Sequence, residues 1–204
     1  MKNEEIIKEY HNYQKKIGTR INLYREVTRL FEVKCALYPG SHIDISPSLV
    51  IPHVIYVDNF KGSMRFFKNI ELIKAIIEEQ KEYLEKCEIS FLGQDYTQKM
   101  SIEPVDLIIS QFAGFVGQAT KHHLKVGGIL LCNDSHGDAT LSRFDDDFEL
   151  IGVMDQNNTF SDSDLNKYFL RSSGEPVDLT AVYEKMKGPK YSLTAENYLF
   201  RKVK

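Results

Sequence analysis

The densest group of polar side chains in the sequence is the run Asn133-Asp134-Ser135-His136-Gly137-Asp138. It continues a mainly apolar stretch, Ile129 to Asn133, that predicts a buried strand. Ligands of open parallel sheets bind beyond the carboxyl ends of the strands, so chemistry is expected here. His136 suits a general base toward an acceptor hydroxyl because histidine ordinarily titrates near neutral pH, with Asp134 or Asp138 orienting it. A solvated loop after the strand is the alternative interpretation.

Two earlier strand ends carry groups that suit a nucleotide. The turn Tyr38-Pro39-Gly40-Ser41 ends an apolar run that begins at Val33. Asp58, followed by Asn59, ends a second apolar run, His53 to Asp58, and lies eighteen residues after Gly40. A carboxylate accepts two hydrogen bonds from a cis-diol, so an acid at this spacing beyond a nucleotide-binding turn predicts ribose binding. A tight Pro-Gly turn and a solvated strand end are the alternatives.

Two further strand ends complete the candidate set. The run Glu88 to Leu92 is followed by Gly93-Gln94-Asp95-Tyr96, which is also ordinary turn chemistry. The run Pro104 to Ser110 leads into Ser110-Gln111-Phe112, where an aromatic ring could stack on a ligand or belong to the core.

The elements that must position these residues follow from hydrophobic periodicity. Helical spacing of apolar residues predicts two helices within the first thirty residues, separated at Gly18-Thr19. They are interpreted either as a packing element or as a lid over a substrate pocket, with a face that carries Tyr10, His11 and Tyr13. Further helices are predicted over 63–67, 70–86, 112–123, 165–169 and 179–186. Strands are predicted over 33–38, 53–58, 88–92, 104–110, 129–133, 148–155 and 197–203. This alternation predicts an α/β domain with a mainly parallel, seven-stranded sheet and an antiparallel last strand.

Composition narrows the function classes. A chain of 204 residues with a net charge of −3 is typical of one ordinary globular domain and does not indicate a broad nucleic-acid surface. Cys35, Cys87 and Cys132 lie too far apart for a cysteine zinc motif, and no apolar run reaches the length of a membrane span. The acidic start of the chain is unlike a signal peptide, so we expect a reduced, cytoplasmic protein. The cysteine spacing gives no support for a metal, and we expect none.

The order of these signals resembles the class I S-adenosylmethionine-dependent methyltransferases over roughly residues 33 to 203. HLKVGGILLCND, residues 123–134, closely resembles the Gly-Gly turn of that family into its fifth strand. The resemblance implies a Rossmann-like sheet with helices on both faces, residues 33–204 forming the domain and residues 1–32 an N-terminal helical extension. It also implies a bound S-adenosylmethionine, with Asp95 near the adenine and Ser110 to Phe112 near the transferred methyl group. The implied cofactor-binding residues are Tyr38, Pro39, Gly40, Ser41, Asp58, Asn59, Asp95, Tyr96, Ser110, Gln111 and Phe112.

The first loop departs from the family pattern. The family has an acid at the strand end and then three glycines at alternate positions, whereas this chain has Tyr38, Gly40, His42 and Asp44 there. Glycine allows backbone conformations and close approaches that a side chain blocks. The loop is therefore expected to take another course or to bind the cofactor more weakly.

The resemblance implies methyl transfer to a small-molecule acceptor, or less favourably to RNA, with His136 and Asp134 as the candidate catalytic pair. The Asn-Pro-Pro-Tyr-like motif of amide-methylating members is absent, and Asn133-Asp134 lacks the partner acid of metal-dependent members. A non-catalytic binding module of the same fold is the first alternative. A nicotinamide-dependent oxidoreductase is the second, although G-x-G-x-x-G is missing.

Overall fold

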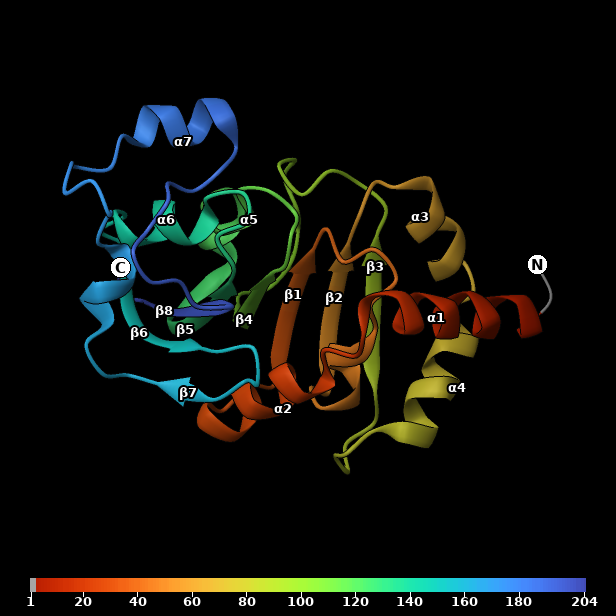
Figure 1. The fold of residues 1–204 in the computed structure, drawn as a ribbon. Coiled ribbons are helices and arrows are strands. Elements are labelled where there is room, and N and C mark those ends of the chain that lie inside the picture. Colours follow the sequence, from red (N-terminus) through yellow and green to blue (C-terminus); the bar gives the residue numbers. More distant parts are fainter. Residues whose placement is uncertain (1–2) are drawn as a thin grey trace. The chain divides into compact units, whose positions relative to one another are not determined.

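The computed structural model describes residues 3–204, which form two compact units, the first ending at Gln98 and the second beginning at Lys99 (Figure 1). The first contains both helices of the predicted extension together with three strands. The predicted boundary after residue 32 stays a prediction.

The first unit is built on three parallel strands with β2 in the centre. They are β1 (Cys35–Pro39), β2 (His53–Val57) and β3 (Glu88–Leu92), in the order β3-β2-β1 (Figure 1). β1 and β2 are buried over four of their five residues, as their near-continuous apolar sequence predicts for parallel strands. The short connection between them contains one 3-10 turn, η1 (Ser46–Leu49), which confirms that no long crossover helix fits there.

Four helices accompany these strands: α1 (Asn3–Ile17), α2 (Ile21–Leu30), α3 (Lys61–Phe67) and α4 (Ile70–Gln80). The predicted break between the first two is confirmed, with Gly18 in the left-handed region at φ +75°. Tyr10 is 2% exposed and packs against Phe66 (6.4 Å between ring centroids), so this face of α1 is a packing face. The prediction that α4 reaches Lys86 is wrong, because the Glu78 carboxylate accepts the Cys87 N–H and folds the chain back after Gln80, leaving Leu84 fully exposed.

The second unit has five strands in the order β4-β5-β8-β6-β7. They are β4 (Val105–Ser110), β5 (Leu124–Cys132), β6 (Phe148–Met154), β7 (Phe160–Ser161) and β8 (Asn197–Lys202). β4 and β5 are parallel, and β8 runs antiparallel to both β5 and β6, which confirms the predicted antiparallel close. The two-residue strand β7 is an addition to the seven predicted strands. The predicted turn at Gly127-Gly128 lies inside β5, where the register with β4 shifts.

The helices of the second unit are short. They are α5 (Val116–Thr120), η2 (Lys121–His123), α6 (Asp138–Arg143), η3 (Leu165–Phe169) and α7 (Leu179–Lys185), the last at the upper edge of the view in Figure 1. The prediction of a helix beginning at Phe112 is wrong, because Phe112 and Gly114 both have positive φ, which helical residues do not adopt. Among residues 3–204 no helix is both long and apolar enough to cross a bilayer.

Candidate functional site

The loop after β1 keeps a glycine-like backbone at two positions. Gly40 has φ +62° and donates its N–H to the Val57 carbonyl (2.8 Å), which ties the loop to the end of β2. His42, at a position where the resembling family has glycine, also has φ +50°. Its ring stacks on Tyr13 (4.9 Å between centroids) and Phe60 (5.4 Å). The backbone conformation is therefore retained, and an aromatic sandwich occupies the side-chain position.

Asp58 joins this loop to the end of β2. Its two carboxylate oxygens accept one backbone N–H each, from His42 (2.7 Å) and from Phe60 (2.7 Å). The predicted ribose-binding acid and the predicted cofactor loop thus lie in direct contact at the carboxyl ends of β1 and β2. Pro39 closes β1, and Ser41 is buried with its hydroxyl 3.5 Å from the His42 carbonyl oxygen.

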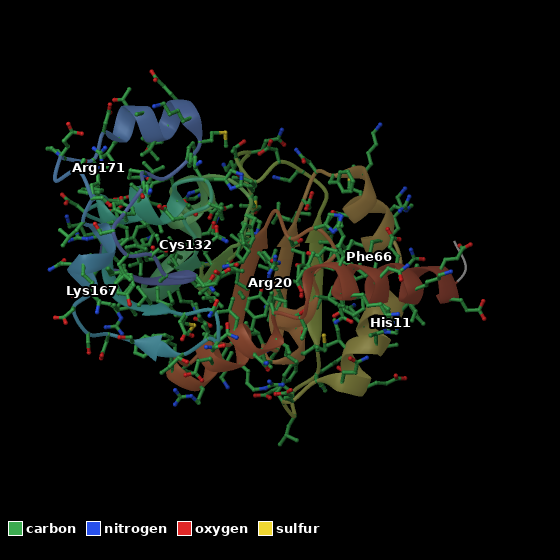
Figure 2. All side chains as sticks on the ribbon, in the orientation of Figure 1. His11, Arg20, Phe66, Cys132, Lys167 and Arg171 are labelled. Atoms are coloured by element: carbon green, nitrogen blue, oxygen red, sulfur yellow. The ribbon has the colours of Figure 1, made fainter. Side chains whose placement is uncertain are left out.

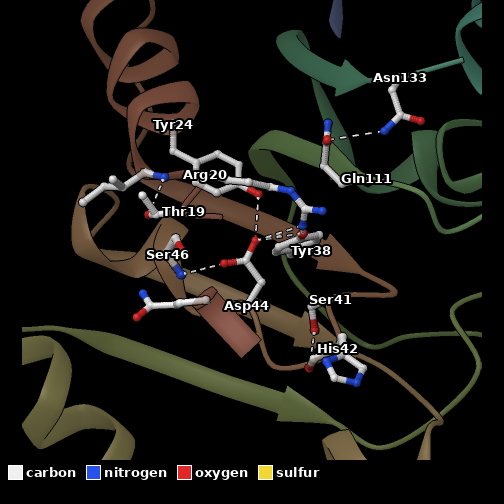
Figure 3. Close-up of polar contacts among 12 residues, drawn as sticks. Thr19, Arg20, Tyr24, Tyr38, Ser41, His42, Asp44, Ser46, Gln111 and Asn133 are labelled. Carbon is white, nitrogen blue, oxygen red and sulfur yellow. Dashed lines mark hydrogen bonds and ion pairs between the residues drawn. The ribbon is translucent and has the colours of Figure 1, made fainter. Parts of the chain in front are cut away.

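A buried carboxylate, Asp44, connects the same loop to Arg20, Tyr24 and Tyr38 and braces it (Figure 3). Its Oδ2 accepts from the Tyr38 hydroxyl (3.2 Å), the Tyr24 hydroxyl (3.3 Å) and the Arg20 guanidinium (3.3 Å), and its Oδ1 accepts from the Ser46 N–H (3.1 Å). Asp44 is 2% exposed. Burial and the nearby Asp44 charge raise the pKa of the Tyr38 hydroxyl well above its ordinary value, so Tyr38 stays a neutral donor.

This brace is the part of the site that sequence reasoning missed. The cofactor-binding role of Tyr38 stays a prediction, and its side chain is 1% exposed and donates to Asp44. Arg20 immediately precedes α2 and donates to the hydroxyl of Tyr38 in β1 (3.2 Å), and Figure 2 labels it over that strand. The only sequence signal was an acid at a glycine position, which needs a cationic or hydroxyl partner when it is buried.

The turn after β3 brings Asn59 and Asp95 together. Asp95 accepts from the Asn59 amide (3.4 Å) and from the N–H (2.9 Å) and hydroxyl (2.7 Å) of Thr97. The hydrogen bonds from Thr97 hold the pKa of the Asp95 carboxyl below its ordinary value. Tyr96 is half-buried in the same turn. Asp58, Asn59 and Asp95 therefore form one polar edge of the first unit.

In the second unit, three amides connect the ends of three strands. Gln111, beyond β4, donates to Asn197 at the start of β8 (2.7 Å) and accepts from Asn133 beyond β5 (3.3 Å). Asn133 in turn accepts from the Ser135 hydroxyl (2.6 Å). Gln111 is 5% exposed, so this chain of amides fixes the strand ends, while Phe112 beside it is 52% exposed.

Ser110 contacts a second buried carboxylate, Asp138. The Ser110 hydroxyl donates to Asp138 (2.5 Å), and so does the Gly117 N–H (2.9 Å). Asp138 is 1% exposed, and burial raises its pKa to about 6 against these hydrogen bonds. Ser110 and Asp138 thus tie β4, α5 and α6 together.

The structure places Asp134 and His136 on one loop without a hydrogen bond between them in the described part of the chain. Asp134 accepts from the N–H (2.7 Å) and hydroxyl (2.8 Å) of Thr140. Burial raises the pKa of the Asp134 carboxyl. His136 instead has its Nδ1 3.0 Å from the Ser135 hydroxyl. Asp134 therefore stabilises the first turn of α6, and its orienting role toward His136 stays a prediction.

A cavity of about 300 Å³ lies at this edge of the second unit. Its wall contains residues from the β5 end, from the segment before β8 and from β8 itself. The residues that line it include Phe112, Asn133, Asp134, Ser135, Tyr191 and Tyr198. Tyr191 and Tyr198 carried no sequence signal, since tyrosines are common in cores. Across residues 3–204 no three His, Cys, Asp or Glu side chains gather in a way that could hold a metal ion.

Comparison with known proteins adds a structural likeness only. No protein-family model matches the sequence, and no curated protein is similar to it. Similar solved structures include TehB from Haemophilus influenzae (14% identity, 93% of this chain, 65% of that chain, TM-score 0.55). They also include the N-methyltransferase NodS from Bradyrhizobium japonicum WM9 (14% identity, 98% of this chain, 98% of that chain, TM-score 0.45). A third is a methyltransferase from Geobacter sulfurreducens (12% identity, 73% of this chain, 83% of that chain, TM-score 0.48). With its parallel strands and antiparallel close, the chain has the class I methyltransferase fold.

Proposed function

We propose that this protein binds S-adenosylmethionine and transfers its methyl group to a small-molecule acceptor. The observation that carries the proposal is the contact between the loop after β1 and the acid after β2, made by the His42 N–H and the Asp58 carboxylate at 2.7 Å. A nucleoside at the edge of a parallel sheet is held by three parts: a strand, a turn with left-handed backbone, and an acid at the end of the next strand.

The residues of this edge fit such a cofactor. The Asp58 carboxylate has about four lone-pair sites and uses two on backbone N–H groups, so two remain for a ribose diol. The His42 Nδ1 is buried and has no hydrogen-bond partner among the described residues, which is uncommon for a buried polar atom. A bound polar ligand would satisfy it.

Bound S-adenosylmethionine supplies the methyl group on its sulfonium centre. The chain's own contribution is to hold both reactants: Asp58 and the braced loop orient one, and the cavity at the β5 end encloses the other. Positioning of this kind lowers a barrier substantially without a covalent intermediate. His136 is the proposed base wherever the acceptor must lose a proton.

Isothermal titration with S-adenosylhomocysteine tests the binding step. We expect saturable binding, weakened at least tenfold in Asp58→Ala, because the diol loses its acceptor. Asp155→Ala is the matched control, since Asp155 also accepts backbone N–H groups after a strand (Asn157 and Thr159, both 2.8 Å) but belongs to the second unit. Absence of binding at millimolar ligand would refute the proposal.

A non-catalytic binding module is the second candidate. It is favoured by His42, whose ring fills the position of a family glycine, and by the absence of a described hydrogen bond between His136 and an acid. Tight binding of S-adenosylhomocysteine with no methylation over a broad acceptor panel would support this candidate over the enzyme.

A further inference from the structure

The segment that follows α7 separates two adjoining cavities of the second unit. Lys187, Gly188 and Pro189 line both the cavity of about 300 Å³ at the β5 end and a second cavity of about 250 Å³. The wall of the second cavity also contains Arg171, Asp178, Val182, Lys185 and Lys190. Figure 2 shows Arg171 on the chain near α7.

The segment is held in place by close backbone packing. Gly188 lies against the Asp134 carboxylate, so that a Cβ at this position would collide with it. A Cβ on Gly137, just before α6, would collide with Val182 of α7 and approach the Gly188 nitrogen (3.2 Å). The lysines of this segment are therefore anchored beside the carboxyl end of β5, where the acceptor is proposed to bind.

The second cavity is cationic. Its wall contains Arg171 and the lysines at 185, 187 and 190 but only one carboxylate, Asp178, which already accepts the Ala181 N–H at the start of α7 (3.1 Å). Within residues 3–204 none of the three lysines makes an ion pair. Four cations outnumber the one acid of the cavity wall and the Glu175 carboxylate near Arg171, and this excess of positive charge indicates an anionic ligand.

The kind of cation indicates which anion. The Arg171 guanidinium donates to the Pro176 carbonyl (2.7 Å) and lies 3.6 Å from the Glu175 carboxylate, so part of its planar fork is engaged. The lysines remain as point charges on flexible stems. A bidentate arginine binds carboxylates and phosphates alike, so the discrimination comes from charge: a cluster of ammonium groups suits the nearly double charge of a phosphate monoester better than the single charge of a carboxylate.

We propose that this cavity binds the phosphate group of a phosphorylated small-molecule acceptor, whose remaining part occupies the adjoining cavity at the β5 end. The identification of the ligand as the methyl acceptor rests on the proposed function. The anion site itself stands on the second cavity alone.

Titration of the full chain with inorganic phosphate, followed by amide NMR shifts at low ionic strength, tests the site. We expect saturable amide shifts over residues 185–190. In K185Q/K187Q/K190Q the dissociation constant for phosphate should be at least tenfold larger. Lys167→Gln is the control for surface charge, since Lys167 is exposed on η3 and does not line the cavity; its constant should stay within twofold. Titration with acetate is the carboxylate arm and should give at least tenfold weaker binding.

Four outcomes would overturn the proposal. They are no shift at these residues up to 20 mM phosphate, an unchanged constant in the triple variant, acetate binding as tightly as phosphate, or a short RNA binding the same lysines far more tightly than phosphate. S-adenosylhomocysteine titrated into the triple variant separates the two proposals, because the cofactor affinity should stay within twofold. Loss of phosphate binding with the cofactor retained supports the anion site, and failure of cofactor binding in the unsubstituted protein refutes only the proposed function.

Discussion

His42 adopts a backbone conformation that side chains rarely adopt, and it does so in the loop that would contact a cofactor. Its φ of +50° costs about 1 kcal/mol for a residue with a Cβ. The rings of Tyr13 and Phe60 on either side offset that cost, since each stacked pair contributes about 0.5–1.5 kcal/mol. Strain held in this way at a ligand loop is consistent with a binding role.

Comparing two substitutions of His42 tests this strain. His42→Gly and His42→Ala both remove the ring, but only glycine adopts positive φ freely, so we expect the glycine variant to be more stable by about 1 kcal/mol in urea unfolding. His11 is exposed within α1 and gives the matched control pair. There we expect His11→Ala to be more stable than His11→Gly by a similar amount, because alanine favours a helix over glycine. Equal stability of the two His42 variants would show that the loop relaxes.

Asp138 is expected to make stability depend on pH. Its pKa is about 6 in the folded chain against an ordinary value of 3.8, so between these values the folded state retains a proton that the unfolded state has lost. This contribution is complete below pH 3.8 and is lost as pH rises through 6, about 3 kcal/mol in total.

Asp138→Asn does not titrate, which gives the test. The unfolding free energy of the variant should lie closest to that of the unsubstituted protein at pH 7 and fall furthest below it at pH 4, as measured in urea across this range. Asp146→Asn is the control, because the Asp146 side chain is 97% exposed and should leave the pH profile unchanged. A pH-independent difference at Asp138 would contradict the assignment.

At the scale of elements, the start of α2 is fastened to the loop after β1. Arg20 just before α2, Tyr24 within it and Tyr38 of β1 all donate to one carboxylate, Asp44. Helix, strand and loop are thereby joined at one buried point. A change on the helix is then expected to reach the loop, which links packing of the N-terminal helices to ligand affinity.

A double-mutant cycle measures this connection. Asp44→Ala removes the buried carboxylate that accepts from Arg20, Tyr24 and Tyr38, so we expect a loss of about 3–5 kcal/mol. The double variant with Arg20→Met should be less destabilised than the sum of the single variants by about 1–3 kcal/mol. The exposed pair Arg25–Glu82 is the control cycle and should give a coupling below 1 kcal/mol. A coupling at Arg20–Asp44 as small as the control would mean that the brace carries little energy.

At the scale of the whole molecule, the fold could be predicted further than the site. Periodicity located seven of the eight strands that the described residues form, because a strand buried in a sheet needs a run of apolar residues whether its neighbours are parallel or antiparallel. It missed β7, whose two residues are too short for any pattern, and it placed a helix at Phe112, where positive φ forbids one. The end of α4 came earlier than predicted, where the Glu78 side chain bonds to the Cys87 backbone beyond the helix.

The sequence by itself determined the order of the strands along the chain and the acid or amide that follows several of them, such as Asp58, Gln111 and Asn133, since both depend on local pattern. Only the tertiary structure decided which partner each polar group takes. Asp58 contacts the loop backbone, Asp44 pairs with Arg20, and Asp134 caps α6 while His136 bonds to Ser135. Buried polar groups must be paired, and the nearest partner in space is chosen by long-range packing that no local pattern encodes.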